Sequence, residues 1–205
     1  MMHLFDFLFP PRVDEIVVRG VSDEDILALI APRLVNTTRP ETVVLLPFSD
    51  PRVRSVTHEA KYHGSARAFE LLALGLAEYL RDADDIRNPI LVPVPLGRER
   101  YKERGFNQVE EVARYALKDL SGKEWGAVDT TLLVRTRETV SQVSLPCHER
   151  EENMRRAFGA AHLASPTCTY ILIDDVTTTG ATLQAAIDAL TSAGAVHVIP
   201  LALAH

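Results

Sequence analysis

The fold of this chain is decided by the stretch Tyr170-Ile171-Leu172-Ile173-Asp174-Asp175-Val176-Thr177-Thr178-Thr179-Gly180-Ala181-Thr182-Leu183. An apolar run leads into two adjacent carboxylates, a hydroxyl-rich turn with one glycine follows, and a helical pattern then begins. This order predicts a strand, a tight loop and a helix N-terminus, with the acids at the carboxyl end of the strand. An ordinary strand–loop–helix unit would also fit, because Asp, Thr and Gly are common turn residues.

The polar residues of this turn suit a phosphorylated sugar. Helix N-termini favour anions because their unpaired N–H groups and the positive end of the macrodipole point outward. Asp174 and Asp175 would repel a phosphate that they faced, so we expect them to bind sugar hydroxyls or a Mg²⁺ held through water. The residues expected around the phosphate are Val176, Thr177, Thr178, Thr179, Gly180, Ala181 and Thr182. Together these groups predict a ribose 5-phosphate ligand.

Strands and helices alternate along the rest of the chain. Short apolar runs typical of strands occur at 42–48, 89–95, 131–134, 170–176 and 196–203. The run at 170–176 is predicted to be the central strand, and prolines confine 89–95 to an edge or a bulge.

Apolar residues at helical spacing predict helices over 64–80, 109–117 and 183–190, and Ser22-Asp23-Glu24-Asp25 is a helix-start signal for a segment that leads to Leu34. The alternation predicts an α/β fold with a mainly parallel central sheet flanked by helices. Ligands of such folds lie at the carboxyl ends of the strands, where the two acids are expected.

Length and composition limit the remaining choices. The 205 residues allow one domain, or one domain with a small appendage. The formal net charge of −6 argues against indiscriminate nucleic-acid binding. Cys147 and Cys168 are the only cysteines and the seven histidines lack metal-ligand spacing, so no zinc site or disulfide framework is suggested. The apolar N-terminal run is too short for a signal or a membrane span, which favours a cytoplasmic protein.

A second group of chemical residues follows the proline-rich strand. Leu96 and Gly97 end that strand, and four cations lie between Arg98 and Arg104. Glycine lets a backbone approach a ligand closely, and arginine binds phosphate oxygens with a bidentate fork. These residues predict a pyrophosphate-binding loop, although a solvated basic stretch, with Glu99 and Glu103 pairing internally, fits as well.

Residues 136–157 form a polar, turn-prone segment that is too long for a simple connector, so we expect a functional loop or hairpin. Arg150 within it is able to reach an anion, and a solvated loop is the default interpretation of its composition.

Several of these motifs occur together in the order found in the ComF/GntX family. They are Lys61-Tyr62-His63-Gly64, Val92-Pro93-Val94-Pro95, Arg104-Gly105-Phe106-Asn107-Gln108, the series Arg135/Thr139/Gln142/Arg150/Asn153/Phe158, and the stretch from Asp174 to Thr182. The match extends from about residue 46 to the C-terminus, so the chain resembles this family over roughly three quarters of its length. The family in turn resembles type I phosphoribosyltransferases and is linked to DNA uptake during natural transformation or to gluconate use.

The resemblance implies a domain over 46–205 that binds phosphoribosyl diphosphate (PRPP) with Mg²⁺ and transfers its phosphoribosyl group to an unknown acceptor. It implies catalytic roles for Asp174, Asp175 and Arg150, and the same two acids as Mg²⁺ ligands through water. Residues 174–182 would bind the ribose and its 5-phosphate, and Leu96, Gly97, Arg98 and Arg104 the pyrophosphate. Related folds are often dimers, so a homodimer is a further expectation.

Two departures from the family qualify these expectations. Family members usually carry an N-terminal four-cysteine zinc module, whereas residues 1–45 contain no cysteine. We therefore expect an appendage there and no zinc. Thr178 stands where 6-oxopurine phosphoribosyltransferases often have an aspartate, and a threonine is no general base near neutral pH, which disfavours purine salvage.

A binding protein of the same fold is the alternative. It would sense PRPP or a nucleotide, or handle single-stranded DNA within a competence apparatus, without turnover. Cations lie beside aromatic residues between Arg98 and Phe106, as they do on strand-binding surfaces.

Overall fold

The computed structural model describes residues 10–83, 86–120, 126–136 and 157–205. Its centre is a five-stranded sheet in the order β1-β2-β7-β6-β3. The strands are β1 (Arg33–Val35), β2 (Thr42–Leu46), β3 (Pro89–Pro93), β6 (Thr169–Val176) and β7 (His197–Ala204). Only β1 pairs in the antiparallel sense within this sheet. The predicted α/β class, with a mostly parallel sheet flanked by helices, is confirmed.

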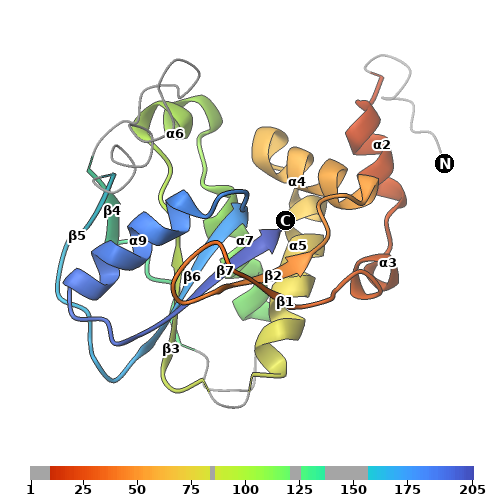
Figure 1. The fold of residues 1–205 in the computed structure, drawn as a ribbon. Helices are drawn as coiled ribbons and strands as arrows, with labels where there is room; N and C mark the ends of the chain where they lie inside the picture. Colours follow the sequence, from red (N-terminus) through yellow and green to blue (C-terminus); the bar gives the residue numbers. More distant parts are fainter. Residues whose placement is uncertain (1–9, 84–85, 121–125, 137–156) are drawn as a thin grey trace.

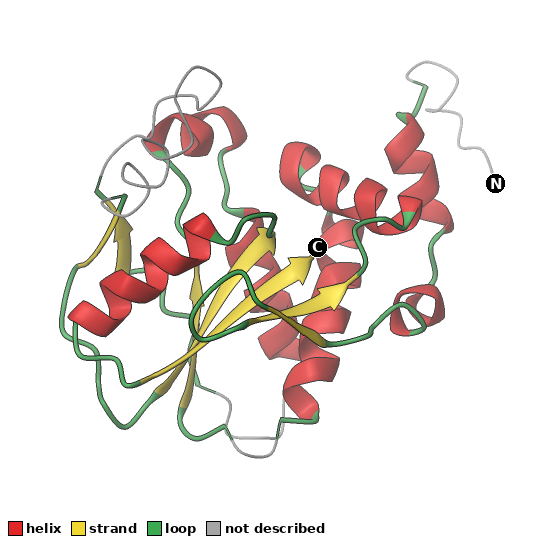
Figure 2. Cartoon of the chain, in the orientation of Figure 1, coloured by secondary structure: helices red, strands yellow, loops and turns green. Residues whose placement is uncertain are grey.

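Helices cover both faces of the sheet (Figures 1 and 2). On one face α5 (Ala66–Arg81) and α7 (Gln108–Asp119) contact the strands, and α4 (Pro51–His63) packs on α5. The other face carries α9 (Ala181–Ser192) and a separate two-stranded ribbon of β4 (Leu133–Arg135) and β5 (Phe158–Ala160). Two helices near the N-terminus, α2 (Val13–Gly20) and α3 (Asp23–Leu27), pack on α4 and α5 respectively.

The side chains of β6 alternate between the two cores, as the period of a strand requires. Ile171 and Ile173 belong to the buried cluster shared with α4, α5 and α7. Tyr170 and Leu172 belong to the cluster shared with α9. Because β6 continues to Val176, the same alternation directs the adjacent acids toward opposite faces of the sheet.

The connection from α4 to α5 was only partly predicted. The pattern indicated one helix from residue 64, whereas Gly64, at φ 59°, ends α4 and Ser65 caps α5 by accepting from the amide of Ala68. Helix α4 was missed because charged residues interrupt its apolar spacing. Its start did carry a signal, since Asp50 caps the helix and Pro51 occupies the first turn.

Other elements differ from the sequence prediction in extent. The capping box at Ser22 forms, but α3 ends at Leu27 and the segment near Leu34 is strand β1. β7 occupies the middle of the five strands, so the prediction of 170–176 as the central strand was wrong. β3 lies at the edge of this sheet, one of the two positions that its prolines allow. The expected boundary at residue 45 falls inside β2. Within the described ranges, no helix combines the length and apolar character needed to cross a membrane.

The core position of Leu172 generates a stability prediction. Leu172 is fully buried, whereas Leu163 is 84% exposed. We expect Leu172→Ala to lower the free energy of unfolding by about 2–5 kcal/mol, because it removes buried methyl groups and leaves a cavity. Leu163→Ala, the matched control, should change it by less than about 0.5 kcal/mol. Urea unfolding measures both, and similar losses would contradict the assigned core.

Candidate functional site

The two predicted binding segments meet at one edge of the sheet. β3 and β6 are parallel neighbours with Pro93 opposite Ile173, and the amide of Val94 donates to the carbonyl of Ile173 at 2.9 Å. Leu96 and Gly97, which follow β3, and Asp174, which lies near the end of β6, are therefore at the same carboxyl edge. This is the location expected for a ligand of such a sheet.

The loop after β6 presents a row of unpaired backbone amides. The amide of Val176 donates to Asp175 Oδ1 at 2.7 Å, and that of Thr177 donates to the carbonyl of Ala204 at 3.1 Å. From residue 178 to residue 183, the amides donate to no atom of the described residues, and no side chain caps α9. Thr178 and Thr179 are exposed, so this helix N-terminus is open to an anion.

Gly180 shapes this loop and is supported by the N-terminal part of the chain. It has a left-handed φ of 74°, and a Cβ there would lie 2.5 Å from the carbonyl oxygen of Thr37. The Arg39 amide also donates to Gln184 Oε1 at 2.8 Å. The connection between β1 and β2 thus packs against the start of α9. Nothing in the sequence indicated this contact, since Thr37 and Gly180 are far apart in the chain.

Asp175 is buried and fully engaged within the protein. Its Oδ2 accepts from Gln108 Nε2 at 2.8 Å and forms an ion pair with Lys61 Nζ at 3.1 Å. Its Oδ1 accepts from the amide of Val176. The sequence indicated a ligand-binding role for Asp175, but the structure places it between α4 and α7.

The same network joins three of the sequence motifs. Arg104 donates to Gln108 Oε1 at 3.0 Å, and its guanidinium carbon lies 5.0 Å from the ring centroid of Tyr62. Phe106 packs so closely on Gly64 that an added Cβ would meet its ring at 3.1 Å. The motifs at 61–64, 104–108 and 174–175 therefore form one cluster around Asp175. Sequence reasoning gave no role to Lys61 or Gln108.

Asp174 has a different environment. It is half-buried on the α9 side, and its Oδ1 accepts from the amide of Asp175 at 2.9 Å. Its side chain also contacts the carboxyl of Asp175, and within the described ranges no N–H group donates to its Oδ2. Burial, followed by repulsion from Asp175, raises the pKa of Asp174 to about 7. Burial acts in the same direction on Asp175, but Lys61 and hydrogen bonds outweigh it and hold the pKa of Asp175 below its usual range.

Only some of the residues expected to bind pyrophosphate lie in a loop. Leu96 and Gly97 follow β3 as irregular chain, but Arg98 to Arg104 form the short helix α6 (Arg98–Arg104). Arg98 lies on its exposed surface, whereas Arg104 is held in the network around Asp175. Arg150 belongs to residues 137–156, the segment of sequence that links β4 to β5, and lies outside the described residues.

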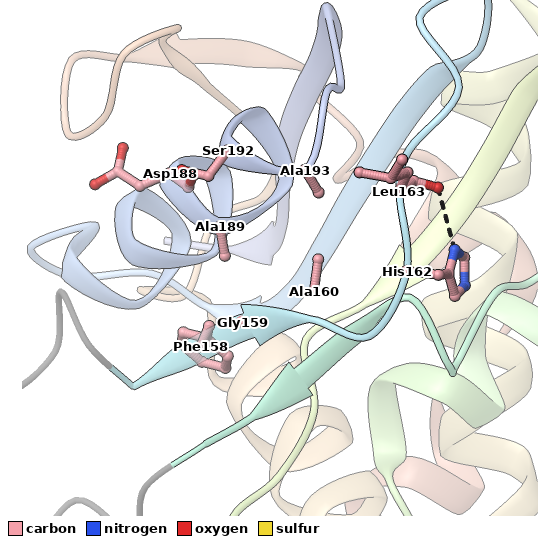
Figure 3. A pocket seen from close by; sticks show the side chains of 9 residues that line it. All are labelled: Phe158, Gly159, Ala160, His162, Leu163, Asp188, Ala189, Ser192 and Ala193. Atoms are coloured by element: carbon pink, nitrogen blue, oxygen red, sulfur yellow. Dashed lines mark hydrogen bonds between the residues drawn. The ribbon is translucent and has the colours of Figure 1, made fainter.

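A hollow of about 520 Å³ lies elsewhere, between β5 and the C-terminal half of α9 (Figure 3). Asp188 and Ser192 lie on one side of it and Phe158 and His162 on the other. None of its described lining residues is an arginine or a lysine, and it is separate from the strand-end residues, so these residues do not suit a pyrophosphate. The carboxyl edge of β3 and β6 is the better candidate site.

In comparisons with known proteins, no family model and no curated protein matches the chain.

The Lys61–Asp175 pair generates a prediction about stability. Lys61→Met leaves a buried carboxylate without its cation, so we expect the free energy of unfolding to fall by about 2–4 kcal/mol at pH 7.5. Asp175→Asn added to Lys61→Met should recover part of this loss. Arg114→Met removes the exposed pair with Glu110 and should cost less than about 0.5 kcal/mol. Urea unfolding compares them, and equal losses for the two single variants would contradict the buried pair.

The raised pKa of Asp174 generates a prediction about pH. When the pKa of a carboxyl is higher in the folded than in the unfolded protein, the free energy of unfolding falls as the pH rises from about 4 to about 7. Asp174→Asn has no ionisable group at this position, so the loss does not occur. Its free energy of unfolding should therefore be about 1–3 kcal/mol higher than that of the wild type at pH 8, and similar to it at pH 4. Unfolding at several pH values tests this, with the exposed Asp188→Asn as control. A difference independent of pH would contradict it.

Proposed function

We propose that this chain binds PRPP with Mg²⁺ at the carboxyl ends of β3 and β6 and transfers its phosphoribosyl group to an acceptor. The fold would then be of the type I phosphoribosyltransferase kind, as the resemblance to the ComF/GntX family implies. The observation that supports the proposal most directly is the run of unpaired amides at 178–183 beside a half-buried acid.

The 5-phosphate binds in the loop before α9. Each charge-assisted hydrogen bond from an amide or a threonine hydroxyl contributes about 1.5–3 kcal/mol. Thr178, Thr179 and Thr182 supply hydroxyls within the same turn, and Gly180 brings the backbone into the required curve. Because Thr37 packs against Gly180, the loop is held in place before the ligand arrives.

Asp174 would bind the ribose hydroxyls or a water of the Mg²⁺ shell through its Oδ2, to which no N–H group of the described residues donates. Asp175 acts differently from the sequence expectation, since all its contacts are internal. It holds Val176 at the start of the loop and anchors Lys61 and Gln108. We therefore assign ligand contact to Asp174 and positioning to Asp175.

Leu96, Gly97 and Arg98 bind the pyrophosphate, because they follow the strand beside β6. Breaking the bond between C1 and the pyrophosphate oxygen builds positive charge on the ribose and negative charge on the leaving group. Electrostatic placement then supplies most of the catalysis. Cations of α6 would stabilise the leaving group, and Arg150 is a further candidate for this role. Mg²⁺, held through water by Asp174, would supply additional positive charge there.

Calorimetry with PRPP and Mg²⁺ tests the binding site. The wild type should show saturable binding, and Asp174→Asn should weaken it at least about tenfold through loss of a charge-assisted contact. Asp188→Asn, which changes an exposed acid on the neighbouring helix α9, should bind PRPP as the wild type does. Undiminished binding by Asp174→Asn would remove the assignment.

Turnover is tested separately, by measuring pyrophosphate release in the presence of PRPP and a panel of bases. Release that depends on Mg²⁺ and on Asp174 supports transfer. Intact binding without release across the panel would favour the alternative of a PRPP or nucleotide sensor. Loss of both would contradict the proposed site.

A further inference from the structure

We propose that His58, Glu59 and His63 of α4 form a second metal site, which binds Zn²⁺ or a similar transition-metal ion. The ligand atoms of these three residues all lie within 4.8 Å of one another. All three ligands lie on α4, outside the loop before α9, and Asp14 of α2 supports one of them. The proposal does not depend on phosphoribosyl chemistry.

Glu59 and His63 supply the first two ligands from successive turns of the helix. Their side chains share one face because they are four residues apart. His63 Nε2 lies 3.9 Å from Glu59 Oε1, too far for a hydrogen bond. Two ligands at about 2.1 Å from a tetrahedral zinc ion are separated by about 3.4 Å. A small rotation of the exposed His63 ring is enough to reach that spacing.

His58 supplies the third ligand, and an ion pair with Asp14 of α2 orients its ring. Its Nδ1 lies 2.9 Å from Asp14 Oδ2, and Asp14 Oδ1 accepts from the hydroxyl of Ser55 at 2.7 Å. This ion pair leaves the other ring nitrogen of His58 for an ion, and carboxylates support many zinc-bound histidines from the side away from the metal. The His58 and His63 rings have centroids 5.8 Å apart, so they border the same space.

Arg12 orients the carboxylate of Glu59 but does not use all the lone pairs of its oxygens. Its Nε and one terminal nitrogen donate to the two carboxylate oxygens at 3.0 and 2.8 Å. Each oxygen has two lone pairs, so one on Oε1 stays available to an ion on the His63 side. Glu59 is only 1% exposed, which keeps this carboxylate in a single position.

The ligand set selects the class of ion. Two imidazoles and one carboxylate suit Zn²⁺ and its neighbours in the first transition row, whereas Mg²⁺ prefers oxygen ligands alone. Three protein ligands leave one tetrahedral position for water. The sequence did not indicate this site, because the spacing of His58 and His63 is no familiar motif and Asp14 comes from another helix.

Titration of the metal-free full-length chain with Zn²⁺, and with Co²⁺ as a spectroscopic probe, tests the site. We expect one ion per chain and the visible absorption of tetrahedral Co²⁺. His63→Ala should weaken binding at least about tenfold, and Asp14→Asn should weaken it by about 10–100-fold through loss of the supporting carboxylate. His63→Gln, which keeps a polar side chain of similar size, should also lose the ion.

His162→Ala is the matched control, because His162 is an exposed histidine 3.9 Å from the carboxylate of Asp129. It should bind as the wild type does, and circular dichroism should show that every variant is folded. Absence of saturable binding by the wild type would overturn the proposal, as would equal affinities for His63→Gln, His162→Ala and the wild type. In either case the cluster would serve only to dock α2 on α4 through ion pairs.

Discussion

The buried contact between Lys61 and Asp175 is the interaction on which the candidate site depends. The period of β6 sends Asp175 into the space between α4 and α7, where a carboxylate without a cation would be costly. Lys61 from the end of α4 and Gln108 from the start of α7 satisfy it. Because Asp175 also accepts from the amide of Val176, this contact fixes where the strand ends and the loop begins.

Because Asp175 is held inside the protein, Asp174 is the acid of the pair that would be available to a ligand. Asp174 lies on the α9 side of the same strand, next to amides that have no partner within the described part of the chain. The loop is supported from two directions, by Asp175 beneath its start and by Thr37 against Gly180. A pre-formed loop of this kind loses little conformational entropy when an anion binds. In the proposed function, stability and ligand binding would thus be divided between two adjacent aspartates.

The sequence predicted the class of the fold and the unit from Tyr170 to Leu183 because both follow from local periodicity and turn composition. It also confined β3 to an edge or a bulge, since proline has no N–H to donate to a neighbouring strand, and β3 lies at the edge of the five-stranded sheet. It could not assign the two acids to different faces, because that depended on whether β6 ended before or after Asp175. The support from Thr37 and the role of Lys61 arise only from tertiary packing, which no local pattern records.

The most direct test of the account is a crystal structure of the chain with PRPP and Mg²⁺. We expect oxygens of the 5-phosphate within about 3 Å of amides in the range 178–183. Asp174 should contact a ribose hydroxyl or a water of the ion, while the Lys61–Asp175 contact stays closed. A ligand bound elsewhere, with these amides facing only solvent, would contradict the account.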